Sequence, residues 1–436
     1  MPENRAASVH APPRDEPVDS AAPGVSQRPD GARVTEPAVP LLHTHDDAVA
    51  AAHQVAQALR PGVIDRDRAG ANTVPREALA ILDSSGLLGI TVPVAHGGPG
   101  LGPRTLAEVT RVLASVDPAI AQIPQGHFLI VDVLTVCGGP EVRERLFAQV
   151  LSGRRIGNAL AERGGRHAQD LTTRLTVDSA GALRLHGRKY YCTGTLTAAW
   201  IAVSALDDEG RLCLALVPRD ADGVSVDTDW NVMGQRATTS GTTTLEAVAV
   251  DPRLVLDYAS AYAVPQQLGA RAQLVHAAIE TGIAGGTVHD TRAYLREHAR
   301  PSSEAVRTGA ATVAGDPHVL HRYGRLATRV RAAEALLADA ARTLERVGLL
   351  PTDARAAATG SLAVAAAKAF ASEVAVEAGS ELFALCGASA TDERWDLHRH
   401  WRNARTHSVH DPVDWKYHHL GAYDIGDVLP PNHGQL

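Results

Sequence analysis

Aromatic residues are scarce in this sequence of 436 residues, which contains 4 Phe, 5 Trp and 8 Tyr, or 4% of the chain. The core must therefore rely on Ala, Leu and Val, and such small side chains favour helices that pack closely. Charged residues make up 21% and the net charge is −7, which argues against nucleic acid or an anionic membrane as the main partner. No apolar run reaches the roughly 20 residues that a transmembrane helix needs, so none is expected.

Cysteine and metal-binding patterns are sparse as well. The four cysteines lie far apart and form no C-x-x-C pair, so we expect free thiols in a reducing cytoplasm rather than a disulfide framework or a structural zinc site. They are Cys137, Cys192, Cys213 and Cys386. Seven of the 20 histidines lie in residues 398–436, but they lack the i, i+4 spacing with nearby acids that is typical of a helical metal site. No metal is therefore expected.

Common nucleotide and hydrolase motifs are missing. No G-x-G-x-x-G opens a βαβ unit, and the nearest stretch, 97–102, lies in a loop broken by proline. Walker A, H-E-x-x-H and G-x-S-x-G motifs are absent too. A built-in nicotinamide domain of Rossmann type is therefore not expected, and any redox chemistry would need reducing equivalents delivered from outside.

Composition and hydrophobic patterning divide the chain into four regions of an α+β protein. Residues 1–43 are rich in proline and too polar to bury a core, which predicts a disordered extension. Residues 44–153 predict an N-terminal helical domain and residues 154–256 a middle β domain. Residues 257–436 predict a C-terminal helical bundle.

Local signals support these regions. Thr44 and Asp47 have the spacing of a capping box ahead of the apolar run 48–59. Further helices are expected at 75–85, 104–115, 119–136, 140–151, 265–299, 317–347 and 353–386. In 317–347 the apolar residues recur at spacings of three and four, as in a bundle seam. Gly379, inside the Ala-rich segment 353–386, predicts a close helix contact.

The middle region predicts an antiparallel sheet. Short runs rich in Val, Thr and Leu are separated by turn signals at 178–181 and 207–210, which are typical of hairpins. No helix-length pattern lies between the strands, so a barrel or sandwich is expected.

Three polar positions could carry chemistry. Asn158 interrupts an apolar strand entry and needs a partner, which a polar ligand could supply. Thr193 ends a strand within Tyr190–Gly194, and His410 stands among polar residues just before Pro412, where an imidazole could hold or relay a proton. A structural Asn, an ordinary strand Thr and a surface His remain the alternatives.

The order of helices, sheet and helices resembles the acyl-CoA dehydrogenase superfamily. Residues 86–93 followed by Gly97 and Gly98 look like its N-terminal signature. Within it, the chain most resembles the flavin-dependent monooxygenase branch, namely the sulfur-acquisition oxidoreductases and their relative dibenzothiophene monooxygenase. The matching stretches are 123–128, 157–162, 191–194, 229–236, 239–241 and 401–412.

The resemblance implies a fold and a chemistry. The fold would be acyl-CoA dehydrogenase-like, with an N-terminal helical domain, a middle antiparallel β-barrel and a C-terminal four-helix bundle. Reduced FMN, rather than FAD, would arrive from a separate NAD(P)H:flavin reductase and react with oxygen to give a C4a-hydroperoxide. The substrate would be a small organosulfur compound of the sulfone or thioether type, used in sulfur acquisition.

The resemblance also implies roles for individual residues. His127, Asn158, Thr193 and His410 would be catalytic, with hydrogen bonds to the flavin edge and the peroxide. Tyr191 and Trp230 would wall the flavin ring, and Arg236 and Ser240 would hold its ribityl phosphate. Arg300 would reach the flavin of a neighbouring subunit, which implies a homotetramer.

Two other hypotheses stay open. An FAD-dependent acyl-CoA dehydrogenase would need a carboxylate base where this chain has His410, so the swap favours oxygen activation. A non-catalytic protein that only binds flavin or a partner is the third. At Ala161 and Ser302 this chain differs from the residues that the family usually carries. The resemblance is therefore weakest at the substrate pocket.

Overall fold

A computed structural model describes residues 38–70, 73–166 and 170–434, so most of the predicted extension lies outside the described residues. The first ordered helix begins as expected. Thr44 accepts a hydrogen bond from the Asp47 backbone while the Asp47 side chain accepts one from the Thr44 backbone, which confirms the capping box. The N-terminal helices are α1 (His45–Leu59), α2 (Val63–Ala69), α3 (Arg76–Asp83), α4 (Pro103–Ala114), α5 (Pro118–Gln122), α6 (Gln125–Cys137) and α7 (Pro140–Leu151).

The segment 119–136 was expected as one helix, and that prediction is wrong. The helix breaks between α5 and α6, where Pro124 takes the position just before α6. Proline has no backbone N–H to donate to the preceding turn, so a helix cannot run through it undisturbed. The break matters because α6 then carries Gly126 against the sheet.

Eight strands form one sheet in the described residues. They are β1 (Ile156–Ala159), β2 (Arg174–Val177), β3 (Leu183–Lys189), β4 (Trp200–Leu206), β5 (Leu212–Pro218), β6 (Val224–Val226), β7 (Thr243–Val250) and β8 (Val255–Leu256). The order is β6-β7-β3-β2-β4-β5-β8, with β1 added beside β4. The hairpins β2–β3 and β4–β5 enclose the two predicted turns and confirm them.

The sheet is mostly, but not wholly, antiparallel. β1 pairs with β4 in parallel, and β2 meets β4 in parallel at one residue pair. The expectation of a purely antiparallel sheet was therefore wrong here, because β1 enters directly from α7 instead of from a hairpin. Among the described strands no pairing joins the two end strands β6 and β8, so hydrogen bonding does not close the sheet into a full barrel.

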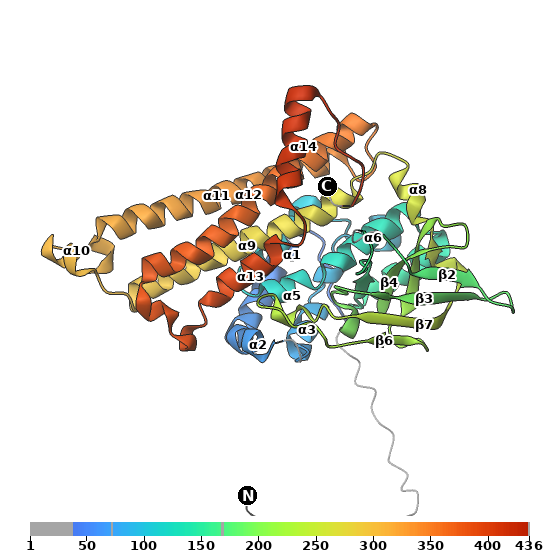
Figure 1. The fold of residues 1–436 in the computed structure, drawn as a ribbon, viewed down its shortest axis with the longest axis horizontal. Helices are drawn as coiled ribbons and strands as arrows, with labels where there is room; N and C mark the ends of the chain where they lie inside the picture. Colours follow the sequence, from blue (N-terminus) through green and yellow to red (C-terminus); the bar gives the residue numbers. More distant parts are fainter. Residues whose placement is uncertain (1–37, 71–72, 167–169, 435–436) are drawn as a thin grey trace, which may run out of the picture. The chain divides into compact units, whose positions relative to one another are not determined.

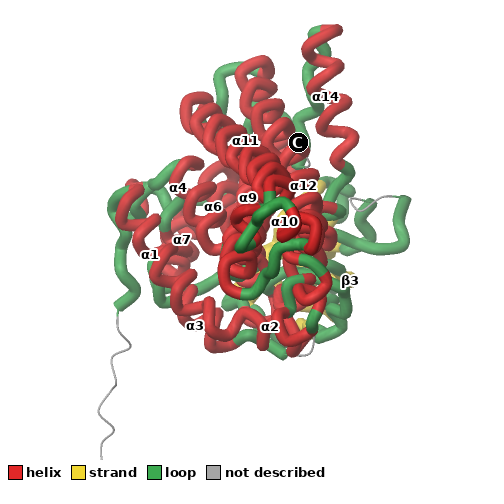
Figure 2. The backbone as a smooth tube through the Cα atoms, turned by 90° about the vertical axis from the view of Figure 1, so that its left-hand side faces the viewer, coloured by secondary structure: helices red, strands yellow, loops and turns green. Residues whose placement is uncertain are grey.

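The C-terminal region is a bundle built on α9 (Leu268–Glu297), α11 (Pro317–Val347) and α12 (Ala354–Cys386). Short helices α8 (Tyr258–Tyr262) and α10 (Ser303–Arg307) flank them, and α13 (His398–Ser408) and α14 (Val413–Gly426) follow. Figures 1 and 2 show α9, α11 and α12 side by side, with α14 projecting from the bundle.

Packing within the bundle follows the sequence pattern. The predicted seam of α11 is buried from Leu326 to Leu344. Gly379 in α12 has the expected close contact, because a Cβ there would lie 2.7 Å from the Trp401 Cα of α13. Two helical stretches, Pro118–Cys137 and Ala354–Cys386, are apolar enough to span a membrane, but 78% and 67% of their most apolar windows are buried inside the structure. Burial of this kind is typical of core helices.

Candidate active site

Asn158 lies on β1, directly against α6. A Cβ on Gly126 would lie 2.7 Å from the Asn158 Cβ, so only glycine lets the helix come this close. The Asn158 backbone N–H donates to the Thr193 carbonyl over 3.3 Å, while the side-chain Oδ1 is buried and has no hydrogen-bond partner among the described residues. A buried amide oxygen without a partner is rare in folded proteins. This atom is therefore placed to bind a polar ligand.

Thr193 starts a short chain of hydroxyl groups. Its Oγ1 lies 2.7 Å from the Ser240 Oγ, and Ser240 in turn donates to the Thr238 Oγ1 over 2.8 Å. The structure thus brings together Asn158, Thr193 and Ser240, which are far apart in the sequence.

The loop 229–241 carries unusual backbone strain. Gln235 and Thr239 both have positive φ, at 53° and 49°, and so does Tyr191 opposite them, at 58°. Left-handed backbone is costly for a β-branched residue such as Thr239, and such strain tends to cluster at functional sites. The Gln235 amide and the Thr239 hydroxyl are also buried without partners in the described part of the chain.

Helix α13 clamps this loop. The Gln235 backbone N–H donates to the Asn403 Oδ1 over 2.5 Å, and Arg402 donates to the Met233 carbonyl over 2.8 Å. A Cβ on Gly234 would lie 2.0 Å from the Arg402 carbonyl oxygen, so the loop can lie this close only through glycine. The strained loop is therefore held by contacts that span the sheet and the bundle.

The two aromatic rings predicted to wall the flavin lie together. The Tyr191 and Trp230 rings meet edge to face with centroids 6.3 Å apart, and the Trp230 indole donates to the Gln235 carbonyl over 2.9 Å. The Arg163 guanidinium lies 4.6 Å from the Tyr191 ring centroid. Such a cation over an aromatic face orders an otherwise exposed tyrosine.

The two predicted arginines differ in their surroundings. Arg236 makes no hydrogen bond or ion pair with another described residue and packs on Gly70, where a Cβ would lie 2.5 Å from its guanidinium. Arg300 is exposed in the loop after α9. Figure 1 shows that this end of α9, next to α10, is the end of the bundle away from the sheet. Arg300 is thus not brought to the Asn158 region of its own chain.

His127 is buried between α6 and the start of β1. It is 0% exposed, its Nε2 lies 3.0 Å from the Leu88 carbonyl, and its Nδ1 accepts the Ile156 backbone N–H over 3.1 Å. Burial and, secondarily, Arg155 lower the pKa of His127 to about 4. With both ring nitrogens bonded to backbone, the side chain links α6 to β1, and its catalytic role stays a prediction.

His410 is half-exposed in the loop between α13 and α14 and lies beside a buried carboxylate. Its Nδ1 is 3.3 Å from the Asp411 Oδ1, and the other Asp411 oxygen is 2.7 Å from the Lys416 ammonium. Burial would raise the pKa of Asp411, but His410, Lys368 and Lys416 outweigh it and hold that pKa well below its usual range. Asp411 is therefore a fixed anion that orients the His410 ring.

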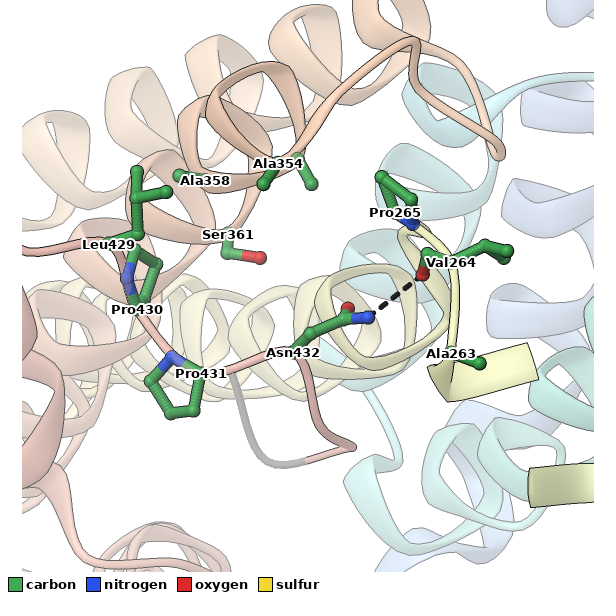
Figure 3. Close-up of a pocket in the computed structure, with 11 residues that line it drawn as sticks. Ala263, Val264, Pro265, Ala354, Ala358, Ser361, Leu429, Pro430, Pro431 and Asn432 are labelled. Carbon is green, nitrogen blue, oxygen red and sulfur yellow. Dashed lines mark hydrogen bonds between the residues drawn. The ribbon is translucent and has the colours of Figure 1, made fainter. Parts of the chain in front are cut away.

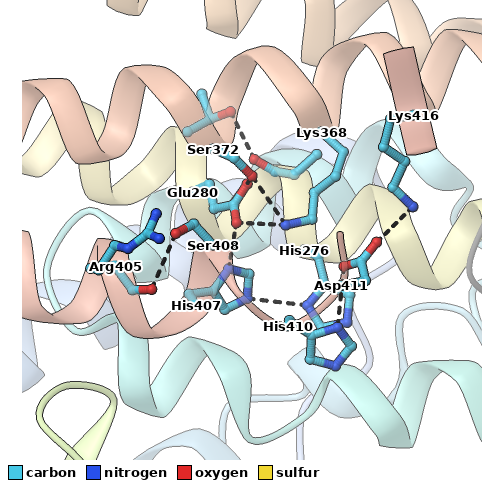
Figure 4. Close-up of polar contacts among 12 residues, drawn as sticks. His276, Glu280, Lys368, Ser372, Arg405, His407, Ser408, His410, Asp411 and Lys416 are labelled. Carbon is cyan, nitrogen blue, oxygen red and sulfur yellow. Dashed lines mark hydrogen bonds and ion pairs between the residues drawn. The ribbon is translucent and has the colours of Figure 1, made fainter. Parts of the chain in front are cut away.

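A buried polar cluster behind His410 was missed in the sequence (Figure 4). Its members lie on α9, α12 and α13 and are His276, Glu280, Lys368, Ser372 and His407. A signal was available: His276 and Glu280 on α9, like Lys368 and Ser372 on α12, stand four apart within a mainly apolar stretch, and such pairs share one helix face.

Two cavities lie beside the C-terminal tail. One, of about 210 Å³, is lined mainly by Ala and Pro, and Asn432 at its edge donates to the Val264 carbonyl over 2.8 Å (Figure 3). The other, of about 380 Å³, is lined by Asp411, Lys416 and His419 among others and so borders the His410 loop.

Comparisons with known proteins agree with this geometry. Sequence models of the acyl-CoA dehydrogenase N-terminal, middle and C-terminal domains match residues 44–154, 158–248 and 274–415. Dibenzothiophene monooxygenase of Rhodococcus erythropolis is 32% identical over 406 residues, covering 88% of this chain and 94% of the relative. The "Probable FMNH2-dependent monooxygenase SfnC" of Pseudomonas putida is 33% identical over 394 residues, with 88% and 96% covered.

A solved structure is similar over the same range. FMN-bound TdsC from Paenibacillus sp. A11-2 has a TM-score of 0.83 and 28% identity, covering 89% of this chain and 100% of that chain. The predicted acyl-CoA dehydrogenase-like α+β fold is thereby confirmed. The chain belongs to the acyl-CoA dehydrogenase superfamily, in the branch of flavin-dependent monooxygenases that includes dibenzothiophene monooxygenase.

Proposed function

We propose that this protein is a reduced-FMN-dependent monooxygenase that oxidises a small organosulfur compound. The names of its relatives support the cofactor and the class of substrate. The chain shows no nicotinamide-binding motif, so a separate NAD(P)H:flavin reductase supplies the reduced flavin. The four cysteines are free, which fits a reducing cytoplasm.

The observation that carries this proposal is the His410–Asp411–Lys416 arrangement. A dehydrogenase of this fold needs a free carboxylate base in this loop, yet Asp411 is buried, ion-paired to Lys416 and in contact with the His410 ring. The group that faces outward is an imidazole. An imidazole suits the holding and return of a proton during oxygen activation better than the abstraction of a proton from carbon.

The residues fit a bound flavin. The unpartnered oxygens of Asn158 and Thr239 and the free Gln235 amide match the donors and acceptors of a flavin ring edge. Thr193 and Ser240 add hydroxyl groups, Tyr191 and Trp230 wall the ring, and Arg236 binds the ribityl phosphate. When bound, the reduced flavin supplies oxygen activation through its C4a-hydroperoxide.

Arg300 completes the site from a neighbouring subunit in a homotetramer. Its exposed position at the far end of the bundle supports a role in another copy rather than in its own chain. Light scattering should give a tetramer, and Arg300→Ala should lower FMN affinity without unfolding the protein. A monomer of full FMN affinity would contradict this part of the proposal.

The test is transient absorbance after mixing anaerobic protein and reduced FMN with oxygenated buffer. We expect a C4a-hydroperoxyflavin band that decays faster when a sulfone or thioether is present. Direct return to oxidised flavin, with no intermediate and no preference for FMN over FAD, would overturn the proposal. That result would favour acyl-CoA thioesters as substrates.

A further inference from the structure

In the polar cluster behind His410, the contacts decide which group donates and which accepts in each hydrogen bond (Figure 4). Glu280 and Lys368 are both 0% exposed and lie 2.5 Å apart, and Ser372 donates to the other Glu280 oxygen over 2.6 Å. Burial would raise the pKa of Glu280, but Lys368 and His407 outweigh it and hold that pKa below its usual value. Glu280 is therefore an ionised carboxylate, which can only accept hydrogen bonds.

The ionised Glu280 fixes the tautomer of His407. The His407 Nδ1 lies 2.9 Å from a Glu280 oxygen, so that nitrogen carries the hydrogen. Burial lowers the pKa of His407 in spite of this contact, so the ring is neutral and its Nε2 is a bare acceptor. The same Nε2 lies 3.0 Å from the Gln122 side-chain oxygen. Two acceptors do not bond each other, so a neutral His407 requires the Gln122 amide to turn its NH2 group towards this nitrogen.

The tautomer of His276 follows in turn. Its Nδ1 is 3.1 Å from the His407 Nε2, so the hydrogen of this bond belongs to His276. Burial, with His410, His407 and Lys368 adding to it, holds the pKa of His276 well below its usual value. A neutral imidazole results, and its ring lies against His410 with centroids 4.1 Å apart.

A neutral His276 matters for the ring that lies against it. Two imidazolium rings at this separation would repel each other, whereas a neutral ring can lie against a protonated one. The other charged groups that face the cluster are Asp411 and Lys416, which are paired with each other. His410, in contact with Asp411 and half-exposed, is the ring with room for a proton.

We propose that three residues of this cluster are positioning residues: Glu280, His407 and His276. Glu280 and His407 hold His276 as a neutral imidazole with its hydrogen on Nδ1. With His276 neutral, His410 is the histidine of this cluster that carries a proton at the flavin site. The part concerning His410 rests on the proposed function. The tautomers of His276 and His407 belong to the protein without any ligand, and they can be measured separately.

The first measurement uses the unmodified full-length protein without flavin. Long-range ¹H–¹⁵N spectra of ¹⁵N-histidine-labelled protein, assigned with His276→Gln and His407→Gln, report the tautomer and charge of each ring. We expect both rings to be neutral with hydrogen on Nδ1 between about pH 6 and 8. A doubly protonated His407, or hydrogen on the Nε2 of either neutral ring, would overturn the proposal whether or not the protein proves to be a monooxygenase.

The second measurement separates positioning from stability. Glu280→Gln removes the negative charge and should release the His407 tautomer. It should also move the alkaline limb of the pH–rate profile for oxygenation to lower pH by roughly one unit, because Lys368 is left uncompensated and its positive charge disfavours a proton on the neighbouring rings. The double variant E280Q/K368M removes both charges. It should return this limb of the pH–rate profile to its original pH, while His407 remains free to change tautomer.

The matched control is Glu162→Gln, which removes a carboxylate from a second buried lysine–glutamate pair, Lys189 with Glu162. We expect it to lower the melting temperature by a similar amount and to leave both the histidine spectra and the pH profile unchanged. An equal shift of the profile in Glu162→Gln would show general destabilisation and would overturn the positioning role.

Discussion

Two buried lysine–glutamate pairs, one in the sheet and one in the bundle, have the same chemistry and different surroundings. Lys189 and Glu162 lie 2.7 Å apart, and the backbone and hydroxyl groups of Thr172 and Thr173 occupy the Glu162 oxygens. Lys189 then donates to Ser204, which donates to a backbone carbonyl. Beyond the ion pair itself, every described hydrogen bond of the sheet pair is thus made with a neutral group, and we call it the closed pair.

The bundle pair, by contrast, has contacts that lead towards the surface, and we call it the open pair. Glu280 accepts from Lys368 and Ser372, but also from His407, and that ring leads to His276 and to the half-exposed His410. Both pairs must offset a large desolvation cost. Of the two, only the open pair has contacts that lead to a half-exposed ring. We infer that a buried ion pair points to function where its contacts continue to such an exposed group.

The largest expected effect is common to both pairs. Lys189→Met or Lys368→Met leaves a buried carboxylate without its cation, so each should lower the free energy of unfolding by about 3–5 kcal/mol. Urea unfolding followed by circular dichroism measures this. Arg342→Met, which removes an exposed ion pair with Asp339, should cost less than about 1 kcal/mol. If either lysine variant lost as little free energy of unfolding as Arg342→Met, the two buried pairs would not share the same desolvation cost.

The next effect concerns only the open pair. His410→Ala should lower the rate of substrate oxygenation by about 100-fold, because a positioned proton carrier is lost. Folding should be unaffected because the side chain is half-exposed. Product formation and hydrogen peroxide release measure the change, with His418→Ala, an exposed ring on α14, as the control. Unchanged coupling would remove His410 from the mechanism.

Acid should destabilise the protein through its buried neutral histidines. An unfolded histidine takes up a proton near pH 6.5, whereas burial holds the pKa of His127 at about 4. The unfolded chain then binds more protons below pH 6.5, so stability falls as the pH drops from 6.5 towards 4. His127 alone should cost about 2 kcal/mol at pH 5.

The burial-lowered pKa values of His276 and His407 act in the same direction. Denaturant titrations at pH 8 and pH 5 should therefore show a smaller loss in His127→Gln than in the unmodified protein. Glu162→Gln should leave the pH dependence through this range unchanged, because the sheet pair has no histidine partner among the described residues. A pH-independent stability between 5 and 8 would contradict the assignment of these rings as neutral.

The smallest effect tests the flavin site beside the sheet. Asn158→Ala should lower FMN affinity about tenfold, equivalent to about 1.4 kcal/mol for one buried hydrogen bond. Gly126→Ala should do the same by displacing the Asn158 side chain, since its Cβ would lie 2.7 Å from that side chain. Flavin fluorescence titration measures both. Unaltered affinity in Asn158→Ala would make this residue structural.

The sequence predicted the parts of the fold that depend on local signals. The capping box at Thr44, the two hairpin turns and the α11 seam involve residues within a few positions of one another, where propensity and periodicity act directly. It did not predict the parallel pairing of β1 with β4, since strand direction depends on where β1 enters the sheet. Helices α13 and α14 were also missed, because polar residues and histidines weaken their apolar pattern.

The candidate site divides in the same way. Asn158, Thr193 and Ser240 each stand in a stretch that resembles the family, and the structure places them near one another. His127 stood in such a stretch too, but the sequence could not show that both ring nitrogens bond to backbone. The Glu280–Lys368 pair was missed because its residues stand 88 positions apart and only the packing of α9 on α12 brings them together.

The clamp between the 229–241 loop and α13 has a consequence for synthesis. Gln235 and Asn403, which meet in this clamp, are 168 residues apart in the sequence. During translation the sheet and most of the bundle are made before the partner of Gln235 exists. A growing chain therefore cannot anchor the 229–241 loop until nearly the whole protein has left the ribosome. A prematurely terminated product that ends before Asn403 would lack this anchor.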